Sequence, residues 1–257
     1  MQGIILKDDK RYVYTESYLK EKGHVINKEG SAPEDLDFIV FPFMGEIDTM
    51  IYNDDYFSSL RPNIRIFSGV RHDYLSEKCL IHGLSYHVMT EARSVQVKNA
   101  IPTSEGVIAY LIRNRVDTIT NSRVLVMGYG ACGSDLAKRL KALDAMVYTL
   151  VRSKEKEAAA LSDGIRPIYF NEFLDMLNFE VIINTIPARV LTNEIIDKTT
   201  AMLIDIASKP YGFDIEYAKT RNEKSSLLPG IPGKHALRTA GEILGEYIEQ
   251  VLRGKLK

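Results

Sequence analysis

Residues 123–133 read RVLVMGYGACG, and this stretch decides the fold class of the chain. An apolar run leads into the pattern GxGxxG, and residues 134–143 continue with a helical period. A strand, a glycine turn and a helix in this order form the context in which the pattern binds a dinucleotide. The first glycine permits the tight turn, the second lets the backbone approach a pyrophosphate, and the third allows close helix–strand packing. The residues predicted to contact the dinucleotide at this turn are Gly128, Tyr129, Gly130, Ala131, Cys132 and Gly133.

The phosphates are expected at the free N–H groups and the positive dipole end of the helix that follows the turn. A glycine-rich turn that binds no ligand is the alternative interpretation. The next strand, residues 146–150, leads to Arg152 and Ser153. A carboxylate for the ribose 2′-hydroxyl of NAD usually stands about 20 residues past the glycines. No acid stands there, and Arg152 suits a 2′-phosphate, so the sequence favours NADP over NAD; a solvated basic turn is the alternative.

Short apolar runs alternate with segments of helical period, which is typical of a parallel sheet covered by helices. Six of these runs lie in the second half of the chain and predict one doubly wound parallel sheet, a Rossmann domain. They are residues 124–127, 146–150, 165–170, 181–184, 202–204 and 226–228. Runs at residues 38–41 and 64–67, with a helix ending at Gly23 before Val25, predict a smaller α/β domain with fewer and shorter strands. The expected fold class is therefore α/β in both halves.

We expect four parts along the chain. Residues 1–100 form the smaller α/β domain for substrate or partner, 101–117 a linking helix, and 118–233 the Rossmann domain. The linking helix is expected to begin at Thr103, because Pro and Thr beside a Glu are typical of a helix start. Residues 234–257 hold an amphipathic helix, which is expected to return and pack on the N-terminal domain. Asp144, in the turn before the strand at 146–150, is expected in a left-handed conformation, which Asp tolerates better than most residues.

The composition limits the classes of protein. With 257 residues, 45% hydrophobic and 26% charged, the chain is long enough for one to two globular domains of about 150 residues each. Lys and Arg number 33 against 34 Asp and Glu, so the net charge is −1, and no strong field attracts nucleic acid or an anionic membrane. No run reaches the length of a signal peptide or membrane span, and Cys79 and Cys132 have no metal or redox spacing. We expect a cytoplasmic protein with no metal, nucleic-acid or membrane partner.

Ligands of doubly wound sheets bind at the carboxyl ends of the strands, so the residues after each strand form the predicted site. These segments contain no Ser-His-Asp set and no metal cluster, so we expect a cofactor to supply the chemistry. Asp205 is expected either to contact the cofactor, to orient Lys209 or to cap its own turn. The further predicted cofactor contacts are Thr185, Ile186, Pro187, Asp205 and Ala207.

A substrate with two carboxylates is expected to lie between a helix N-terminus and a lysine. Thr103 and Ser104 would hold one carboxylate at the N-terminus of the linking helix, and Lys209 or Lys234 the other. Glu105 is either a general base or an acid that compensates the helix dipole, and Glu105 and Lys209 are the predicted catalytic residues. His235, at the start of the last helix, could titrate near neutral pH but is more often structural there. The predicted substrate contacts are Ser68, Gly69, Thr103, Ser104 and Lys234.

Five motifs together resemble the A subunits of dipicolinate synthase, an enzyme of bacterial spore formation. The resemblance extends over roughly residues 36–250. The motifs are NAIPTSEG at 99–106, GYGACG at 128–133, NTIPA at 184–188, IDIASKP at 204–210 and LPGIPGK at 228–234. The opening residues 3–11 are shorter than in the family and lack its glycine turn, so an abbreviated N-terminal half is expected.

The resemblance implies a two-domain fold like that of D-2-hydroxyacid dehydrogenases and oxidation of dihydrodipicolinate to dipicolinate with NADP. It also implies a partner, the flavoprotein-like B subunit, together with a homo-oligomer and a location in the mother-cell cytoplasm of a sporulating bacterium. Two other functions stay open. One is a nucleotide-binding regulatory or scaffold subunit without catalysis of its own. The other is a D-2-hydroxyacid dehydrogenase, for which His235 would need an acid partner that the preceding residues do not supply.

Overall fold

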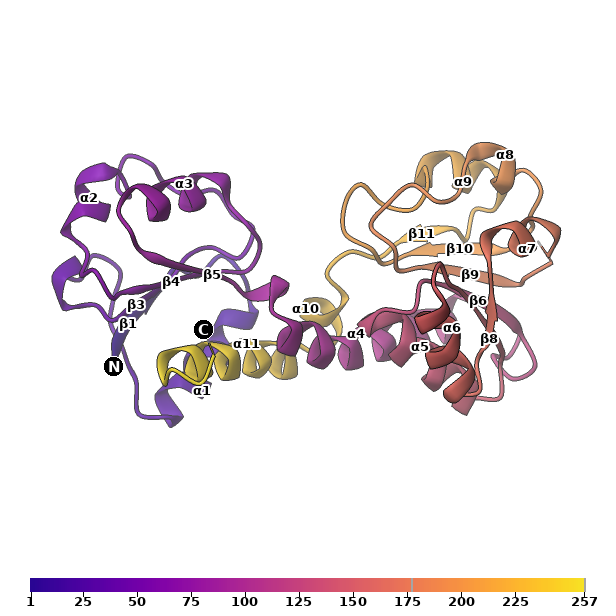
Figure 1. Cartoon of the computed structure of the whole chain (residues 1–257), viewed down its shortest axis with the longest axis horizontal. Helices are drawn as coiled ribbons and strands as arrows, with labels where there is room; N and C mark the ends of the chain where they lie inside the picture. The colour runs from indigo at the N-terminus through magenta and orange to yellow at the C-terminus, as the bar shows by residue number, and fades with distance from the viewer. Residues whose placement is uncertain (177, 257) are drawn as a thin grey trace. The chain divides into compact units, whose positions relative to one another are not determined.

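The computed structural model describes residues 1–176 and 178–256, and the chain divides into two compact units. Unit 1 comprises Met1–Lys98 and Ala236–Lys257, and unit 2 comprises Asn99–His235. Each unit is built on a parallel sheet with helices on both faces (Figure 1), which confirms the predicted α/β class. No helix in the described part of the chain is both long and apolar enough to cross a membrane.

Unit 2 holds a six-stranded parallel sheet in the order β11-β10-β9-β6-β7-β8. The chain winds outward from β6 in one direction, returns to the middle and winds outward from β9 in the other, so the order reverses between these two strands. In chain order the elements are β6 (Arg123–Met127), α5 (Ala131–Ala142), β7 (Met146–Leu150), α6 (Lys154–Ser162), β8 (Arg166–Ile168), α7 (Phe170–Asp175), β9 (Val181–Asn184), α8 (Asn193–Ile196), β10 (Met202–Asp205), α9 (Ile215–Arg221), β11 (Ser226–Leu227) and α10 (Ile231–His235). All six predicted strands of this half are confirmed.

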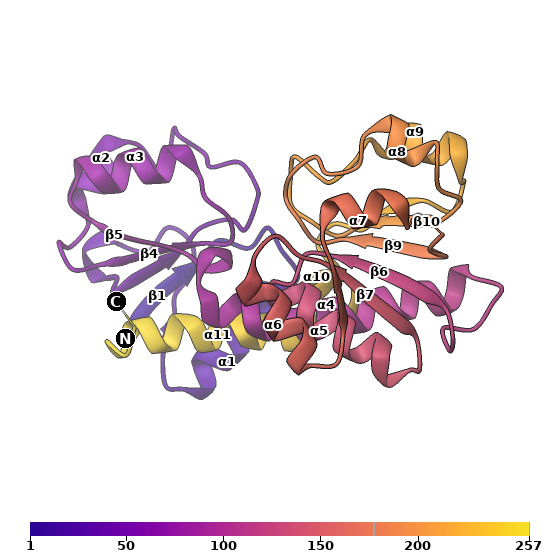
Figure 2. The ribbon, with the colours of Figure 1, turned by 45° about the vertical axis from the view of Figure 1, so that its right-hand side comes forward.

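Alternating side chains of the central strands produce the two faces of this sheet. Val124 and Val126 of β6 pack with α4 (Arg93–Asn114), α5 and α6, whereas Leu125 and Met127 pack with α7, α8 and α9. Figure 2 shows these two groups of helices on opposite sides of the sheet. The near-continuous apolar sequence of the central strands follows from burial on both faces.

Unit 1 holds a five-stranded parallel sheet in the order β2-β1-β3-β4-β5. Helices α2 and α3 cover one face and α1 and α11 the other. In chain order the elements are β1 (Gln2–Ile5), α1 (Arg11–Glu21), β2 (Val25–Ile26), the 3-10 turn η1 (Pro33–Asp35), β3 (Phe38–Val40), α2 (Asp54–Ser59), β4 (Arg65–Ser68), α3 (Asp73–Ile81), β5 (Ser85–Val88), the 3-10 turn η2 (Met89–Glu91) and α11 (Leu237–Leu252). The helix predicted to end at a glycine before a strand is α1, and Gly23 has a φ of +86°.

The C-terminal helix α11 packs on α1 and so returns to the N-terminal unit, as the fold class predicted. Two glycines of α11 allow the close approach, because a Cβ at Gly241 would lie 2.4 Å from the carbonyl oxygen of Arg11 and one at Gly245 would lie 2.9 Å from the ring of Tyr18. The Thr15 hydroxyl donates a 2.9 Å hydrogen bond to the carbonyl of Gly241.

The predicted start of the linking helix at Thr103 is wrong. Helix α4 begins at Arg93 and continues through Pro102, whose ring removes one backbone donor. Val95, Ala100 and Val107 are buried, so the apolar face runs past the proline, and this packing outweighs the local break. Asp144 has a φ of +60°, which confirms its predicted left-handed conformation.

Candidate active site

The ends of four strands of unit 2 lie in one register row at the carboxyl edge of the sheet. Leu150 of β7 is paired with Met127 of β6, Met127 with Asn184 of β9, and Asn184 with Asp205 of β10. The segments after these residues therefore leave the sheet side by side, at the edge where doubly wound sheets bind ligands. The structure thus brings together the glycine turn, Arg152 and the segments that begin at Thr185 and Ile206.

The three glycines of the turn have different surroundings. Gly128 has a φ of +95°, which disfavours any side chain, and a Cβ at Gly133 would lie 2.1 Å from the carbonyl oxygen of Gly128. A Cβ at Gly130 would meet nothing within 4 Å, so space is open on that side of the backbone. Helix α5 begins directly after Gly130, and the N–H groups of its first turn have no acceptor within the helix. Free N–H groups beside open space fit the pyrophosphate of a dinucleotide.

Side chains from neighbouring elements hold this turn. The Tyr129 hydroxyl donates a 2.7 Å bond to Asp163, and burial together with this bond raises the pKa of Tyr129. Thr185 donates from its hydroxyl to the carbonyl of Met127 at 2.8 Å, so the segment after β9 is tied to the end of β6. Burial raises the pKa of the Cys132 thiol, which keeps a negative charge away from the proposed phosphate position. The turn is therefore pre-formed.

Arg152 and Ser153 follow β7 beside the glycine turn. Val151 is buried and donates its N–H to the carbonyl of Ile168, which sets the direction of the chain. Ser153 caps α6 by accepting the N–H of Lys156 at 3.3 Å. Arg152 is exposed, and no ion pair of its guanidinium is found among the described residues. It is free to bind an anion at the carboxyl edge.

The geometry of Asp205 does not support the prediction that its carboxylate contacts the cofactor. Asp205 is 1% exposed, and its carboxylate accepts the N–H groups of Ala207 at 2.9 Å and Gly212 at 2.5 Å and the amide of Asn184 at 3.1 Å. Both carboxylate oxygens accept bonds from the chain itself, so Asp205 caps and shapes the loop after β10, which is one of the alternatives that its sequence left open. Ala207 and Ile186 remain at the edge on which the site is built.

The geometry of α4 does not support the predicted substrate contacts at Thr103 and Ser104. Thr103 and Ser104 lie inside the helix, are 7% and 0% exposed, and offer no free backbone N–H groups. The Thr103 hydroxyl donates to the carbonyl of Asn99 at 2.6 Å. Because the helix extends ten residues N-terminally of Thr103, from Arg93, its terminal dipole is too distant to hold a carboxylate there.

Ser68 and Gly69, at the end of β4 in unit 1, are occupied by their own surroundings. Ser68 is fully buried, donates to the carbonyl of Val70 and shares a 2.7 Å bond with the hydroxyl of Tyr86. A Cβ at Gly69 would lie 2.2 Å from the ring of Phe43, so the glycine is required for packing. The prediction that these two residues bind substrate is not supported by their geometry.

Glu105 is neither at a helix start nor free. It lies within α4, and its carboxylate is 3.5 Å from Nη1 of Arg139 on α5. The first-turn interpretation of Glu105 is therefore wrong, and the ion pair does not support the general-base interpretation. Lys209 and Lys234 are both exposed, and no ion pair of either is found in the described part of the chain. Lys234 and His235 end the short helix α10, which packs on α4 at Gly106.

No sequence pattern selects Glu157, Asp163 or Tyr169. Asp163 holds the tyrosine of the glycine turn, and Glu157 and Tyr169 contact Lys154 beside Arg152. For Asp163 the sequence shows only that an acid precedes Gly164 at the end of a helix, and this does not indicate a contact with Tyr129. Nothing in the spacing indicates that Tyr169 meets Glu157, because the contact depends on how β8 pairs with β7.

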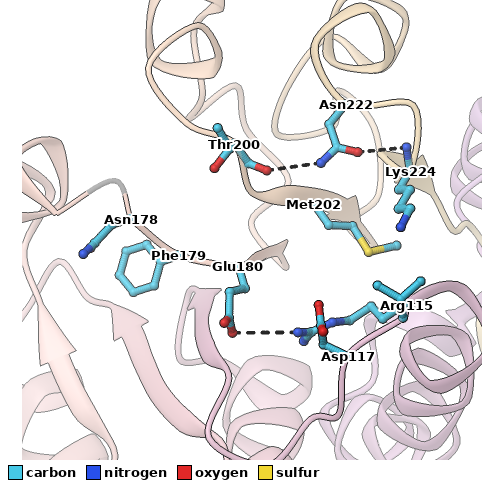
Figure 3. A pocket seen from close by; sticks show the side chains of 10 residues that line it. Arg115, Asp117, Asn178, Phe179, Glu180, Thr200, Met202, Asn222 and Lys224 are labelled. Carbon is cyan, nitrogen blue, oxygen red and sulfur yellow. Dashed lines mark hydrogen bonds and ion pairs between the residues drawn. The ribbon is translucent and has the colours of Figure 1, made fainter.

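A hollow of about 350 Å³ lies at the opposite edge of the sheet, where β9 and β10 begin (Figure 3). Arg115 and Glu180 face each other at 3.7 Å, and Asn222 donates to the carbonyl of Thr200. None of the predicted site residues lines this hollow. The carboxyl edge, and not this hollow, is therefore the candidate active site.

Comparison with known proteins shows the family of the chain. Residues 89–205 match the family model of the D-isomer specific 2-hydroxyacid dehydrogenase, NAD binding domain. The chain is 30% identical to the A subunit of dipicolinate synthase from Bacillus subtilis, over 85% of this chain and 78% of that protein. The crystal structure of the same Bacillus subtilis protein has a TM-score of 0.90 at 25% identity and covers 100% of this chain and 98% of that chain. The crystal structure of the Bacillus halodurans counterpart has a TM-score of 0.88 at 26% identity, covering 98% and 97%.

The fold, the glycine turn and the family model define an NAD(P)-dependent oxidoreductase with the architecture of D-2-hydroxyacid dehydrogenases. Within that class, the chain belongs to the family of dipicolinate synthase A subunits. The expectation of an abbreviated N-terminal half stays a prediction, because these coverages do not compare the lengths of the N-terminal halves.

Proposed function

We propose that this protein oxidises dihydrodipicolinate to dipicolinate (pyridine-2,6-dicarboxylate) with NADP as the acceptor. The observation that carries the proposal is the similarity to the A subunit of dipicolinate synthase over most of both chains. In the reaction the dihydropyridine ring loses a hydride to the nicotinamide and a proton to solvent, and an aromatic ring and NADPH result. Because aromaticity drives this step, the protein needs to place the two reactants more than to supply strong acid–base catalysis.

NADP would lie along the carboxyl edge of unit 2. The pyrophosphate would contact the backbone between Gly128 and Gly133, and Arg152 would bind the 2′-phosphate. Thr185, Ile186, Pro187 and Ala207 would line the ribose and nicotinamide end, because their segments follow β9 and β10. The cofactor supplies the hydride acceptor, and the residues of the chain orient it.

The substrate dianion would be held by Lys209 and Lys234. Lys209 lies in the loop after β10 and Lys234 in α10, which follows β11, and neither has an ion pair among the described residues. In this arrangement the two lysines bind the two carboxylates of the substrate, and the reaction uses no separate catalytic base. This agrees with the ion pair of Glu105 and the internal hydrogen bonds of Asp205.

The family relationship supports three proposals about the setting of the protein. The partner would be a flavoprotein-like B subunit, since the related protein is the A subunit of its synthase. The chain would form a homo-oligomer and would act in the mother-cell cytoplasm of a sporulating bacterium.

An absorbance assay tests the proposed reaction. The purified chain, alone and with a B subunit, receives NADP or NAD and 4-hydroxytetrahydrodipicolinate, which gives dihydrodipicolinate by loss of water. Dipicolinate absorbance and formation of the reduced nucleotide are followed together. Equal rates of both signals, abolished by Lys209→Met and Lys234→Met together, support the proposal. NADP binding without either signal, with or without the B subunit, contradicts it.

The latter result would favour a regulatory or scaffold subunit that binds nucleotide. The specific observation behind this second candidate is that the carboxylate of Glu105 pairs with Arg139 and that of Asp205 is buried and bonded to its own loop.

A further inference from the structure

Lys154, the first residue of α6, has two partners that are themselves held in place. Its ammonium lies 2.8 Å from Oε2 of Glu157 and 5.3 Å from the centre of the Tyr169 ring. The Tyr169 hydroxyl donates a 3.0 Å bond to the same Oε2, and the Tyr169 N–H donates to Glu172 at 2.7 Å. Lys154 is therefore positioned from two elements, its own helix and the start of α7.

The position of this group relates it to the proposed NADP site. Lys154 follows Arg152 and Ser153, which leave β7 beside the glycine turn. Its side chain is 85% exposed, whereas that of Glu157 is 25% exposed, so the ammonium can move and the carboxylate cannot easily follow. The bond to Glu157 raises the pKa of Lys154, and the bond to Lys154 lowers the pKa of Glu157, so both groups are charged at neutral pH.

A charge comparison shows what this arrangement can do. A phosphate monoester carries about −1.5 to −2 charges at neutral pH, and Arg152 supplies one positive charge. An ammonium two residues further on can supply the second charge if it leaves its carboxylate. Glu157 would keep the Tyr169 hydroxyl as a partner after that exchange.

We infer that Lys154 is a second specificity-determining cation for the 2′-phosphate of NADP, held in readiness by Glu157 and Tyr169. This inference rests on the proposed NADP preference. With NAD, which lacks the phosphate, Lys154 stays on Glu157 and contributes nothing to binding. Glu157 is a positioning residue that acts through Lys154. The strength of its ion pair determines how much free energy is needed to move the Lys154 ammonium to the phosphate.

The test is a titration of the full-length chain with NADP and with NAD at low ionic strength, where exposed charges are least screened. Lys154→Met should weaken NADP by about threefold to tenfold, between the worth of an exposed ion pair and of a charged hydrogen bond, and should leave NAD unchanged. The matched control is Lys156→Met, because Lys156 lies on the same turn and pairs with Glu155 instead. Equal losses in both variants would show a general charge effect and overturn the inference.

Glu157→Gln provides the second arm. Gln keeps an acceptor for Tyr169 but releases Lys154, so NADP should bind about twofold to fivefold more tightly, and this gain should vanish in the Lys154→Met background. A gain of the same size in that background would contradict the positioning role. If Arg152→Ala weakens NADP selectively and Lys154→Met does not, the cofactor proposal stands and this inference fails. If the unaltered chain binds both nucleotides equally, the NADP preference itself fails.

Discussion

The two sheets have the same parallel architecture, but their carboxyl edges are used differently. In unit 1 the loop after β3 is bonded from within, because Asp8 accepts the N–H groups of Phe43, Met44 and Gly45 at 2.6–3.1 Å. In unit 2 the N–H groups of the first turn of α5 have no acceptor within the helix, and the space beside Gly130 is open. A carboxylate of the protein occupies the first edge, whereas the second is left for an anion from solution. This difference is why we assign the cofactor to unit 2.

The largest effect is expected at Gly133, where the turn of unit 2 is packed rather than open. In Gly133→Ala the new methyl group would lie 2.1 Å from the Gly128 carbonyl oxygen, so the backbone must shift. We expect the free energy of unfolding to fall by about 3 kcal/mol, at the upper end of overpacking costs, and nucleotide binding to be lost with it. Denaturant unfolding monitored by circular dichroism measures the change. An unchanged midpoint would mean that the turn tolerates a side chain.

Gly130→Ala is the matched control for Gly133→Ala, because it adds the same methyl group to the second glycine of the same turn. Its methyl group meets no protein atom within 4 Å, and its φ of −86° is allowed for Ala, so stability should fall by no more than about 1 kcal/mol, the cost of Ala at an N-cap. The methyl group would instead occupy the proposed phosphate position and should weaken dinucleotide binding by about 3 kcal/mol, more than one charged hydrogen bond. Calorimetric titration with NADP tests this. Retained affinity would place the pyrophosphate elsewhere.

Arg152→Ala should separate the two nucleotides. Loss of the guanidinium removes hydrogen bonds to the 2′-phosphate and should weaken NADP by about 1.5–3 kcal/mol, with little effect on NAD. Arg152→Lys keeps the charge but not the planar pair of donors, so its affinity for NADP should be intermediate. Equal losses of NADP and NAD in either variant would show that Arg152 does not contact the 2′-phosphate.

A smaller effect on stability is expected at the carboxyl edge of unit 1, where side chains of the protein bond to one another. Arg11 donates to both oxygens of Asp9, at 2.8 and 2.7 Å, and lies over the ring of Phe43. These bonds hold the pKa of Asp9 below its usual range, so the stabilisation is full above the ordinary aspartate pKa and is lost as the pH falls through the lowered value.

Asp9→Asn should therefore lower stability by about 1 kcal/mol at neutral pH, a value reduced because the pair is partly exposed, and the loss should shrink on acidification. Nucleotide affinity should not change. Thermal unfolding from pH 7 to pH 3 provides the measurement, and a difference between variant and parent that is independent of pH would contradict the assignment.

Local features of this chain could be predicted from the sequence because neighbouring residues determine them. The runs at 124–127 and 181–184 form central strands, GxGxxG forms the turn before a helix, and Gly23 ends a helix with a positive φ. Hydrophobic periodicity and the conformational range of glycine act over a few residues, so the sequence alone specified the Rossmann sheet and the position of the dinucleotide turn.

Only the tertiary structure decided which polar groups remain free. Burial of Val95 and Val107 carried α4 through Pro102, and this placed Thr103 and Ser104 inside the helix instead of at its start. Asp205 is satisfied by the N–H of Gly212, and Glu157 by the hydroxyl of Tyr169, contacts that depend on loop paths and strand pairing. Hydrogen-bond partners that are distant in sequence meet only after the sheet has formed. The sequence therefore identifies the polar residues near a site, but it does not show which of them remain unpaired and able to bind a ligand.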